Sequence, residues 1–428
     1  MTRGAAGAPG LAPGDGAHAR RPPGRRAPST DPSAGAPSWF PPSAIGHSDG
    51  SMRAFSCPVC SRLVTFESDR CLHCGAAMAF DPATRGLVAL DFGTVAVADA
   101  ATQAVEGRDR CANATLIGCN WLAPPTAPAI PVEGPDPNAG APRDALCASC
   151  ALTRTRPADG DTEGIERFAG AERQKRRLHF ELLELGLPIT DGQETPGGLV
   201  FDLLSSAVEP VTTGHADGVV TIDLAEEDDV HRVKMREQLA EPYRTMLGHL
   251  RHEVGHYYWT VIVADAGEEA LLAEARELFG DDREDYGAAL DRHYAEGAPD
   301  DWEDRHVSAY ATMHPMEDWA ETWAHYLHLW DALQTAASYR VSVAGPEHVT
   351  DPSGTFAGRV EAPVVGRFPE ALEQWLPVSY ALNALNRSLG SQDLYPFVLS
   401  PPVVEKLAFI DRAVAAAATP RPVGVPTT

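Results

Sequence analysis

The sequence has no long apolar run and few basic side chains. No stretch of its 428 residues approaches the about 20 uninterrupted apolar residues of a membrane-spanning helix. The first thirty residues contain arginines but no apolar core, so we expect no secretory signal. Lys and Arg number 35 against 60 Asp and Glu, and the net charge of −25 disfavours non-specific binding to nucleic acid or anionic lipid. We therefore expect a soluble, cytoplasmic protein that contacts no membrane and no nucleic acid.

Cysteine is missing from the second half of the chain. All eight cysteines lie between Cys57 and Cys150. This segregation predicts a separate cysteine-rich module at residues 52–156. At about 150 residues per domain, the length allows two or three domains. Residues 1–51 have almost no aliphatic periodicity, which predicts a disordered extension. The alternative is that this extension is untranslated and that the protein starts at Met52.

The first four cysteines form two C-x2-C pairs. Cys57-Pro-Val-Cys60 and Cys71-Leu-His-Cys74 are separated by ten residues. Each pair can present two thiolates to one ion, which is the pattern of a tetrahedral zinc site. Disulfides are the alternative, but adjacent C-x2-C pairs rarely serve as structural crosslinks. The pattern predicts one structural zinc bound by all four of these cysteines.

The other four cysteines are spaced more loosely. Cys147-Ala-Ser-Cys150 is a third C-x2-C pair, and Cys111 and Cys119 precede it across a proline-rich loop at 123–146. We expect this quartet to bind a second structural zinc, although an interleaved pairing of the eight cysteines is also open. Because so small a module has little core, the metal is expected to fold it.

From about residue 171 the pattern changes and becomes mainly helical. Leucines at near-helical spacing predict a helix through 178–185, and short strands are expected at 199–204 and 219–224. Nearly everything after residue 226 reads as helix. The sequence thus predicts an α+β protein, in which the cysteine-rich module precedes a mainly helical domain with a small sheet at 165–412. Residues 413–428 are expected to form a flexible tail.

One predicted helix, Thr245–Val263, carries residues suited to metal chemistry. His252 and His256 are four residues apart, so their side chains lie one turn apart on the same face. With Glu253 between them they form the H-E-x-x-H pattern, in which two imidazoles bind zinc and the glutamate deprotonates a zinc-bound water. His249 is too far along the axis from His256 to share the ion, and we expect it to be solvated or supporting.

A third ligand is expected from a later helix. This helix begins at His314-Pro315, with proline at its first position and acidic residues in its first turn. Glu317 and Glu321 share a face, so one could bind zinc while the other accepts the free N–H of a ligand histidine. Two alternatives remain open. The acidic turn could simply complement the helix dipole, and His314 could be the third ligand.

Several of these segments together resemble a known family. They are similar to the bacterial zincin-like family named "putative zinc-binding metallopeptidases", whose members carry an N-terminal zinc-ribbon region. The similarity spans residues 52–412, and the runs that carry it are Gly214–Gly218, Glu241–Thr245, His252–Trp259, Phe279–Asp282 and Glu317–Tyr326.

The resemblance implies a role for each residue of the site. It implies that His252 and His256 are zinc ligands and that Glu253 is the catalytic base. In glutamate-type zincins the first glutamate of an E-x-x-x-D/E helix binds the metal, which makes Glu317 the ligand and Glu321 the partner of a ligand histidine. In related enzymes a tyrosine that precedes the third ligand often steadies the oxyanion, and Tyr310 and His314 are the candidates in this chain.

The leading hypothesis is therefore a zinc metallopeptidase that has one catalytic and two structural zincs. Glu253 takes a proton from the zinc-bound water and later passes it to the leaving amine. An exposed strand at 219–224 is expected to pair with an extended peptide substrate. Residues 215–330 contain nine Lys and Arg and 27 Asp and Glu, which could favour basic peptides or could be an ordinary solvated face. The alternative is a non-catalytic zinc-ribbon protein that binds or regulates other proteins and retains the metallopeptidase fold.

Overall fold

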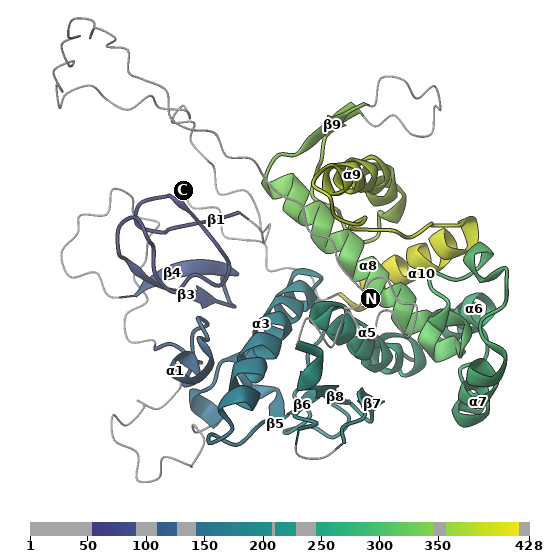
Figure 1. Cartoon of the computed structure of the whole chain (residues 1–428), viewed down its shortest axis with the longest axis horizontal. Coiled ribbons are helices and arrows are strands. Elements are labelled where there is room, and N and C mark those ends of the chain that lie inside the picture. The colour runs from purple at the N-terminus through teal and green to yellow at the C-terminus, as the bar shows by residue number, and fades with distance from the viewer. Residues whose placement is uncertain are drawn as a thin grey trace, which may run out of the picture. The chain divides into compact units, whose positions relative to one another are not determined.

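The computed structural model describes residues 54–90, 109–125, 143–207, 210–227, 245–345 and 357–418. All of them belong to one compact unit, Asp49–Thr428. Small strands and a cysteine-rich region come first, and long helices with a small sheet follow (Figure 1). This order confirms the predicted α+β class. The predicted disordered or untranslated extension at 1–51 lies outside the described residues.

The cysteine-rich region consists of short elements. Its two antiparallel hairpins pair β1 (Phe55–Ser56) with β2 (Leu63–Val64) and β3 (Ala77–Asp81) with β4 (Gly86–Leu90). Three short helical segments follow, namely α1 (Ala114–Ile117), η1 (Arg143–Ala145) and α2 (Ala148–Ala151). The end of the predicted proline-rich loop 123–146 is thus a helical turn, and residues 126–142 of that loop lie outside the described part of the chain.

Aromatic rings fill the core of this region. Phe66 and Phe80 pack edge to face with ring centroids 5.0 Å apart, and Trp121 lies 4.8 Å from Phe80. Phe180, from the first long helix, α3 (Thr162–Glu184), packs at 5.5 Å against both phenylalanines. The cysteine-rich region therefore shares its core with the helical region instead of having a separate one.

His179 makes this shared core sensitive to pH. Its ring lies edge-on to Trp121, and burial together with the charge of Lys175 lowers its pKa to about 3. In the unfolded chain a histidine has a pKa of about 6.5, so on acidification it binds a proton that the folded protein does not bind. The free energy of unfolding is therefore expected to fall by about 2 kcal/mol between pH 7 and pH 5 through this residue alone.

Urea denaturation at the two pH values measures this effect. Carboxylates also titrate in this range, so the relevant quantity is the difference between the wild type and His179→Gln, which has no titratable side chain there. The wild type should lose more stability than the variant on acidification. Equal losses in the two proteins would contradict the prediction.

A four-stranded sheet follows the cysteine-rich region. Its strands are β5 (Thr153–Thr155), β6 (Val200–Leu204), β7 (Gly214–Ala216) and β8 (Val219–Asp223), in the order β5-β6-β8-β7. β6 pairs in parallel with β5 and β8, whereas β7 pairs antiparallel with β8. The strands predicted at 199–204 and 219–224 are confirmed as β6 and β8. The prediction that 219–224 has an exposed edge is wrong, because β8 is hydrogen-bonded on both sides and β7 forms the edge.

The remainder of the described chain is mainly helical, as predicted. Besides α3, its helical segments are η2 (Leu224–Glu227), α5 (Met246–Trp259), the π-helical turn η3 (Thr260–Ala264), α6 (Glu269–Phe279), α7 (Tyr286–Glu296), η4 (Trp302–Asp304), η5 (Tyr310–Thr312), α8 (Pro315–Ser338), α9 (Phe368–Ser388) and α10 (Pro401–Ala417). A hairpin of β9 (Ser342–Ala344) and β10 (Ala357–Arg359) stands between α8 and α9. None of the helices in the described ranges is long and apolar enough to cross a bilayer.

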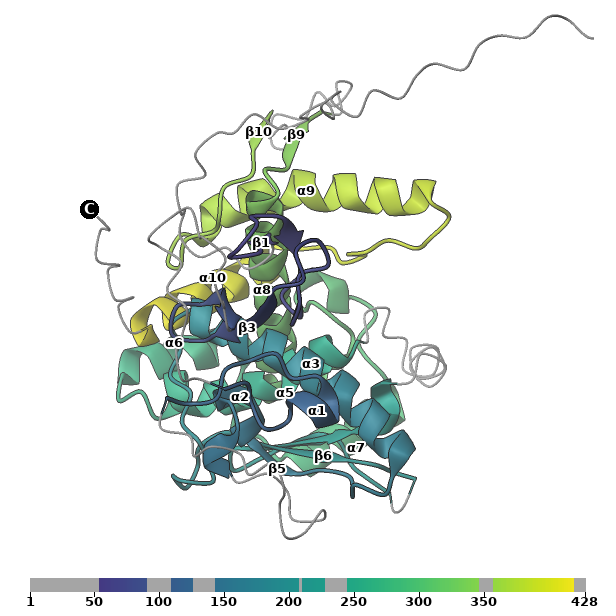
Figure 2. The ribbon, with the colours of Figure 1, turned by 90° about the vertical axis from the view of Figure 1, so that its left-hand side faces the viewer.

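These elements are layered around α5 and α8. The four-stranded sheet lies on one side of α3 and α5, and α9 with the β9–β10 hairpin lies on the opposite side, with α8 between them (Figures 1 and 2). Apolar side chains at helical spacing face this interior, including Leu250, Val254, Trp319 and Trp323. α10 packs beside α8 and continues through buried Ala413 and Val414 to Ala417, so the flexible tail predicted from 413 starts too early. Residues 419–428 lie outside the described chain.

Candidate metal centre

Two helices carry the predicted site residues, and local sequence fixes where each helix begins. α5 starts after Thr245, whose hydroxyl oxygen accepts a hydrogen bond from the backbone N–H of Gly248 at 3.0 Å. α8 starts with Pro315 at its first position and with His314 as its N-cap residue. Because each helix has a defined first residue, the direction in which His252 projects from α5 and the glutamates project from α8 is also defined.

α5 and α8 pack almost backbone to backbone at Gly255. A Cβ atom at this position would lie only 3.1 Å from Ala320 Cα, tighter than most real Cβ contacts, so the close approach favours glycine. Trp319 on α8 donates its indole N–H to the carbonyl oxygen of Gly255 at 2.8 Å. Gly255, the residue just before the second histidine, therefore permits the approach that brings the two halves of the site together.

The structure places His252, His256 and Glu317 around one point. His252 Nε2 lies 3.0 Å from one carboxylate oxygen of Glu317, and His256 Nε2 lies 3.5 Å from the other. One ligand atom from each of the three lies within 4.8 Å of the others. A tetrahedral ion with ligands at about 2.1 Å separates its ligand atoms by about 3.4 Å. The donor set and its spacing therefore fit a zinc ion.

Glu321 lies behind His252, opposite to Glu317. His252 Nδ1 is 2.7 Å from one Glu321 oxygen, and Ser308 donates its hydroxyl to the other oxygen at 2.7 Å. Burial would raise the pKa of Glu321, but the hydrogen bond from His252, the charges of His252 and His325 and the Ser308 hydroxyl lower it to about 2. An ionised Glu321 accepts the Nδ1 proton of His252, so Nε2 is the nitrogen that faces Glu317; burial alone would lower the pKa of His252, but Glu317 and Glu321 together raise it.

The buried carboxylate of Glu317 is also held in its ionised form. Burial by itself would raise its pKa, but the charge of His256 and the hydrogen bonds and charge of His252 bring the pKa well below its usual value. Glu253 is the neighbour of His252 on α5 and is also buried. His249, one turn earlier, pairs with Glu226 and is not one of the three converging residues.

Two tyrosines lie at the same site. Tyr286, the first residue of α7, donates its hydroxyl to Glu317 Oε1 at 3.0 Å. Tyr310 lies beside the site, with its ring centroid 6.1 Å from that of His252. The pKa of each hydroxyl is raised by burial first and then by the charges of Glu317 and Glu253, so both tyrosines are protonated donors. Sequence reasoning found Tyr310 but missed Tyr286, which belongs to no recognisable motif.

Contrary to the prediction, His314 does not point into the metal site. Its Nδ1 accepts the backbone N–H of Met316 at 3.1 Å, and its Nε2 lies 3.0 Å from the carbonyl oxygen of Glu284. Both ring nitrogens are therefore engaged in capping α8 and binding the preceding loop. The prediction of His314 as third ligand or oxyanion donor is wrong, because neither nitrogen is free.

His215 on the edge strand β7 is a further residue of the site that sequence reasoning did not single out. Its ring stacks on that of His256, with centroids 6.1 Å apart and planes 12° apart. Asp217 and Gly218 form the tight turn after β7 with φ angles of 50° and 84°, and the Gly218 N–H donates to His215 Nε2 at 3.1 Å. Burial and the charge of His256 lower the pKa of His215 to about 4, so its ring is neutral at pH 7.

The eight cysteines form two separate clusters and no disulfide. In the first cluster, Cys57 and Cys74 have their sulfurs 3.7 Å apart, and Cys60 and Cys71 have theirs 3.6 Å apart. In the second, Cys119 lies 3.7 Å from both Cys147 and Cys150, and Cys111 completes the quartet. Four thiolates at about 2.3 Å from a tetrahedral zinc are separated by about 3.8 Å. The spacing fits zinc in each cluster, and the quartets are consecutive in sequence rather than interleaved.

Comparison with known families agrees with this geometry. Residues 164–413 match the model of a family described as "Putative zinc-binding metallo-peptidase". The chain belongs to this family. Residues 54–161 match the model of a zinc-ribbon domain, which covers both cysteine clusters. The metallopeptidase family and its N-terminal zinc ribbon are those that the sequence motifs resembled.

Relatives of this metallopeptidase-family chain occur in mycobacteria. Proteins of Mycobacterium bovis and of two strains of Mycobacterium tuberculosis are each 47% identical to it over 366 residues. The similarity covers 85% of this chain and 95% of each relative, and each relative is described only as an uncharacterised protein. No solved structure matches the chain.

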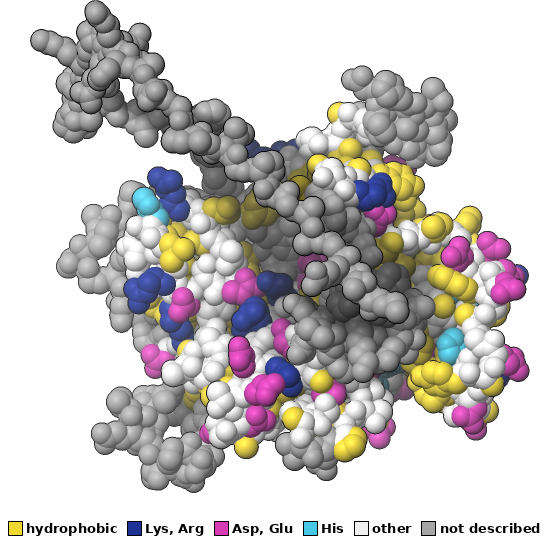
Figure 3. Space-filling view, viewed as in Figure 1, with side chains coloured by type: hydrophobic (Ala, Val, Ile, Leu, Met, Phe, Trp, Pro, Cys, Tyr) yellow, Lys and Arg dark blue, Asp and Glu magenta, His cyan; other side chains and the backbone are white. Residues whose placement is uncertain are grey.

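The surface next to the candidate metal centre of this metallopeptidase-family chain is acidic. Residues 265–304, which include α6 and α7, carry 15 acidic and three basic side chains. Acidic side chains are spread over α6 and α7 in the space-filling view (Figure 3). Since Tyr286 of α7 contacts Glu317, this acidic segment adjoins the candidate metal centre.

Proposed function

We propose that the protein is a zinc-dependent peptidase. His252, His256 and Glu317 would hold the catalytic ion, and the two cysteine clusters would hold two structural zincs. The observation that carries the proposal is the convergence of two imidazole nitrogens and one buried, ionised carboxylate at tetrahedral spacing. Three protein ligands leave a position open for solvent or substrate, which distinguishes a catalytic zinc site from a closed structural one.

When bound, zinc would polarise the scissile carbonyl group and lower the pKa of water at the site towards about 7. Glu253 is the group proposed to accept the proton of the attacking water and to return it to the leaving amine. Its position between the ligand histidines on α5 supports this role, because a helical step of about 100° directs it beside the metal position rather than at it. Glu321 keeps the His252 imidazole in the tautomer that presents Nε2.

The two tyrosines have different proposed roles. Tyr310 would donate its hydroxyl to the oxyanion that develops on the scissile carbonyl, because burial beside Glu317 keeps its proton in place. Tyr286 would orient Glu317 through its 3.0 Å hydrogen bond. These roles are separable, because only loss of Tyr310 would remove a donor to the reacting atoms.

The substrate is proposed to be an extended peptide that pairs with β7. Among the described residues β7 is an edge strand of the sheet and packs near α5, and its His215 stacks on His256. A peptide bound along this edge would therefore pass beside the metal ligands. The acidic surface of α6 and α7 would favour basic side chains in that peptide. Eight free thiols suited to zinc are stable in a reducing compartment, which supports action in the cytoplasm.

Loss of the catalytic ion provides the test of this function. His256→Ala is expected to bind one zinc fewer than the wild type and to cleave no peptide, because His252 and Glu317 alone cannot complete the site. Zinc content is measured by elemental analysis, and cleavage is profiled on a proteome-derived peptide library. The matched control is His293→Phe, which changes a histidine of α7 outside the converging set and keeps an aromatic ring against Tyr310.

The outcome also separates the two classes of function. A peptidase should show zinc-dependent cleavage by the wild type and by His293→Phe but none by His256→Ala. A protein that keeps this fold only to bind partners should hold the His256-dependent zinc but cleave no peptide in the library. Equal zinc content in the wild type and His256→Ala would contradict the assigned ligands.

A further inference from the structure

The two cysteine clusters differ in how deeply they lie in the protein. In the first cluster Cys60 is partly exposed and Cys74 is exposed, and its buried members pack in a small apolar cluster of their own. In the second, all four cysteines are at most 1% exposed and belong to the main hydrophobic core. The second cluster is therefore surrounded by the same core that supports the metal centre.

The chain leads directly from the second cluster into the four-stranded sheet. Cys147 is the N-cap residue of α2, and its sulfur accepts the backbone N–H of Cys150 at 3.4 Å. Two residues later, the Leu152 carbonyl oxygen accepts the N–H of Phe201 on β6 at 2.8 Å, and β5 begins at Thr153. β5 then pairs in parallel with β6. A shift of Cys150 would therefore displace the first strand of the sheet.

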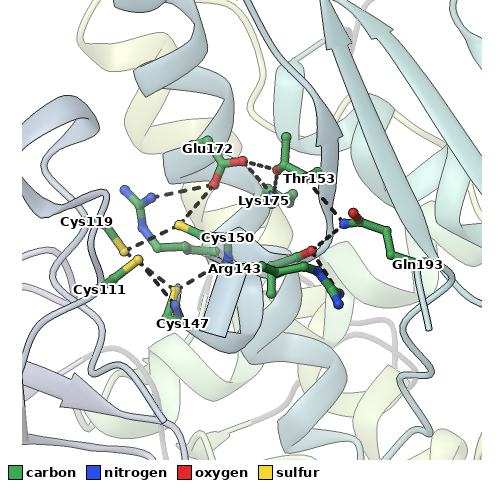
Figure 4. Close-up of polar contacts among 11 residues, drawn as sticks. Cys111, Cys119, Arg143, Cys147, Cys150, Thr153, Glu172, Lys175 and Gln193 are labelled. Carbon is green, nitrogen blue, oxygen red and sulfur yellow. Dashed lines mark hydrogen bonds and ion pairs between the residues drawn. The ribbon is translucent and has the colours of Figure 1, made fainter. Parts of the chain in front are cut away.

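Buried polar side chains tie the same cluster to α3 (Figure 4). Cys150 Sγ lies 3.7 Å from one oxygen of Glu172, and the other oxygen of Glu172 binds Lys175 Nζ at 2.5 Å. Thr153 of β5 donates its hydroxyl to that second oxygen. Lys175 Nζ also lies 5.3 Å above the ring of Phe201 on β6. These contacts connect the cluster, α3 and two strands of the sheet.

Arg176 is the buried cation that this network does not neutralise. Its side chain is 3% exposed and its Nη1 lies 3.9 Å from Glu172 Oε2, too far for a hydrogen bond. Nη1 has no hydrogen-bond partner among the described residues. Burial alone would lower the pKa of Arg176, but the charges of neighbouring thiolates and of Glu172 raise it.

The negative charge of a metal-bound second cluster explains why a buried cation is needed beside it. Four thiolates around one divalent ion carry a net charge of −2, and a buried charge needs a partner. Glu172 and Lys175 cancel one another, which leaves Arg176 to offset one of these two negative charges, and the charges of Cys119, Cys147 and Cys150 raise its pKa. A guanidinium N–H without a partner is also suited to donate to a metal-bound sulfur.

We propose that the second cysteine cluster is a structural metal site of the catalytic domain, where Arg176 offsets part of its negative charge and the bound ion positions α3 and β5. The division into a zinc ribbon up to residue 161 and a peptidase from residue 164 therefore cuts through one structural unit. α3 also connects the second cluster to the candidate metal centre, because its Glu181 binds Arg251, the residue before His252. The first cluster, by contrast, is peripheral to the catalytic domain.

Stepwise removal of metal from the wild-type protein tests the proposal without relying on cleavage activity. A zinc chelator is added in increasing amounts, and maleimide labelling mapped by mass spectrometry reports which cysteines have lost their ion. Hydrogen exchange of α3 and β5 is followed in the same samples. We expect protection of α3 and β5 to be lost with labelling of Cys111, Cys119, Cys147 and Cys150, and to survive labelling of the first cluster. Loss of protection with the first cluster alone, or full protection after the second is labelled, would overturn the proposal.

Arg176→Met gives a second measurement, and Arg173→Met is its matched control because Arg173 is exposed on the same helix. Removing a charged donor from the sulfurs is expected to speed zinc release from the second cluster by about 10-fold or more, with no change in the first. Release at the wild-type rate would contradict the role of Arg176. Neither measurement uses peptide cleavage, so failure of this proposal would leave the proposed peptidase function untouched, and the reverse also holds.

Discussion

Glu253→Gln is expected to lower the rate of peptide cleavage by about 10²–10⁴-fold, the usual contribution of a general base. Glutamine has nearly the same shape as glutamate and can keep the packing of this buried position on α5. It cannot accept a proton from water, and it removes no proposed metal ligand. The variant should therefore hold as much zinc as the wild type and cleave far more slowly. The measurement is kcat/KM on a peptide identified from the library, together with zinc content.

A matched control guards against a general effect of removing a negative charge. Glu277→Gln changes an exposed glutamate of α6 in the same way and should cleave at close to the wild-type rate. If Glu253→Gln keeps its zinc and also keeps the wild-type rate, the proposed base is wrong. If both variants slow cleavage of a basic peptide equally, the effect comes from the acidic surface and not from proton transfer.

Arg251→Met is expected to reduce the free energy of unfolding by about 3–5 kcal/mol. Arg251 is 2% exposed and its guanidinium binds Glu181 of α3 and, at 3.0 Å, Asp331 of α8. Methionine can fill much of the space, but it removes the cation from the buried carboxylate of Glu181, which costs more than the ion pair contributes. Urea denaturation of the zinc-loaded protein measures the change.

Two further variants give this prediction its controls. Arg387→Met removes a similar ion pair, with Asp393, but that arginine side chain is 59% exposed, so its loss should cost less than about 1 kcal/mol. Arg251→Met combined with Glu181→Leu should regain part of the lost stability, because the buried carboxylate is also gone. A loss for Arg251→Met no larger than that for Arg387→Met would show that this pair does not hold α3, α5 and α8 together.

The residues of the metal centre that could be predicted from sequence are those whose relation is local. His252, Glu253 and His256 lie within one turn of a single helix, so helical periodicity alone fixes their relative positions. The same holds for Glu317 and Glu321 on α8, and for the C-x2-C pairs of the cysteines. In each case a spacing of a few residues already constrains the side-chain geometry.

The residues that escaped prediction depend on contacts between distant segments. Tyr286 reaches Glu317 only because the start of α7 lies beside α8. His314 has the composition of a ligand but is engaged in capping α8, which depends on where the helix begins. Strand order in the sheet made β7 the edge in place of the strand at 219–224, and no local pattern distinguishes an inner strand from its neighbour.

The sequence by itself determined the fold class, the two cysteine quartets and the paired motif residues, because each rests on local spacing or on composition, and its resemblance to known sequences indicated the family. The tertiary structure alone decided which helix faces meet, that Gly255 lets α5 and α8 approach closely, and that the cysteines of the second cluster lie in the main hydrophobic core. The physical reason is that burial and charge balance are properties of packed surfaces. The pKa of the buried Arg176, for example, is raised by the charges of cysteines more than twenty residues earlier in the chain.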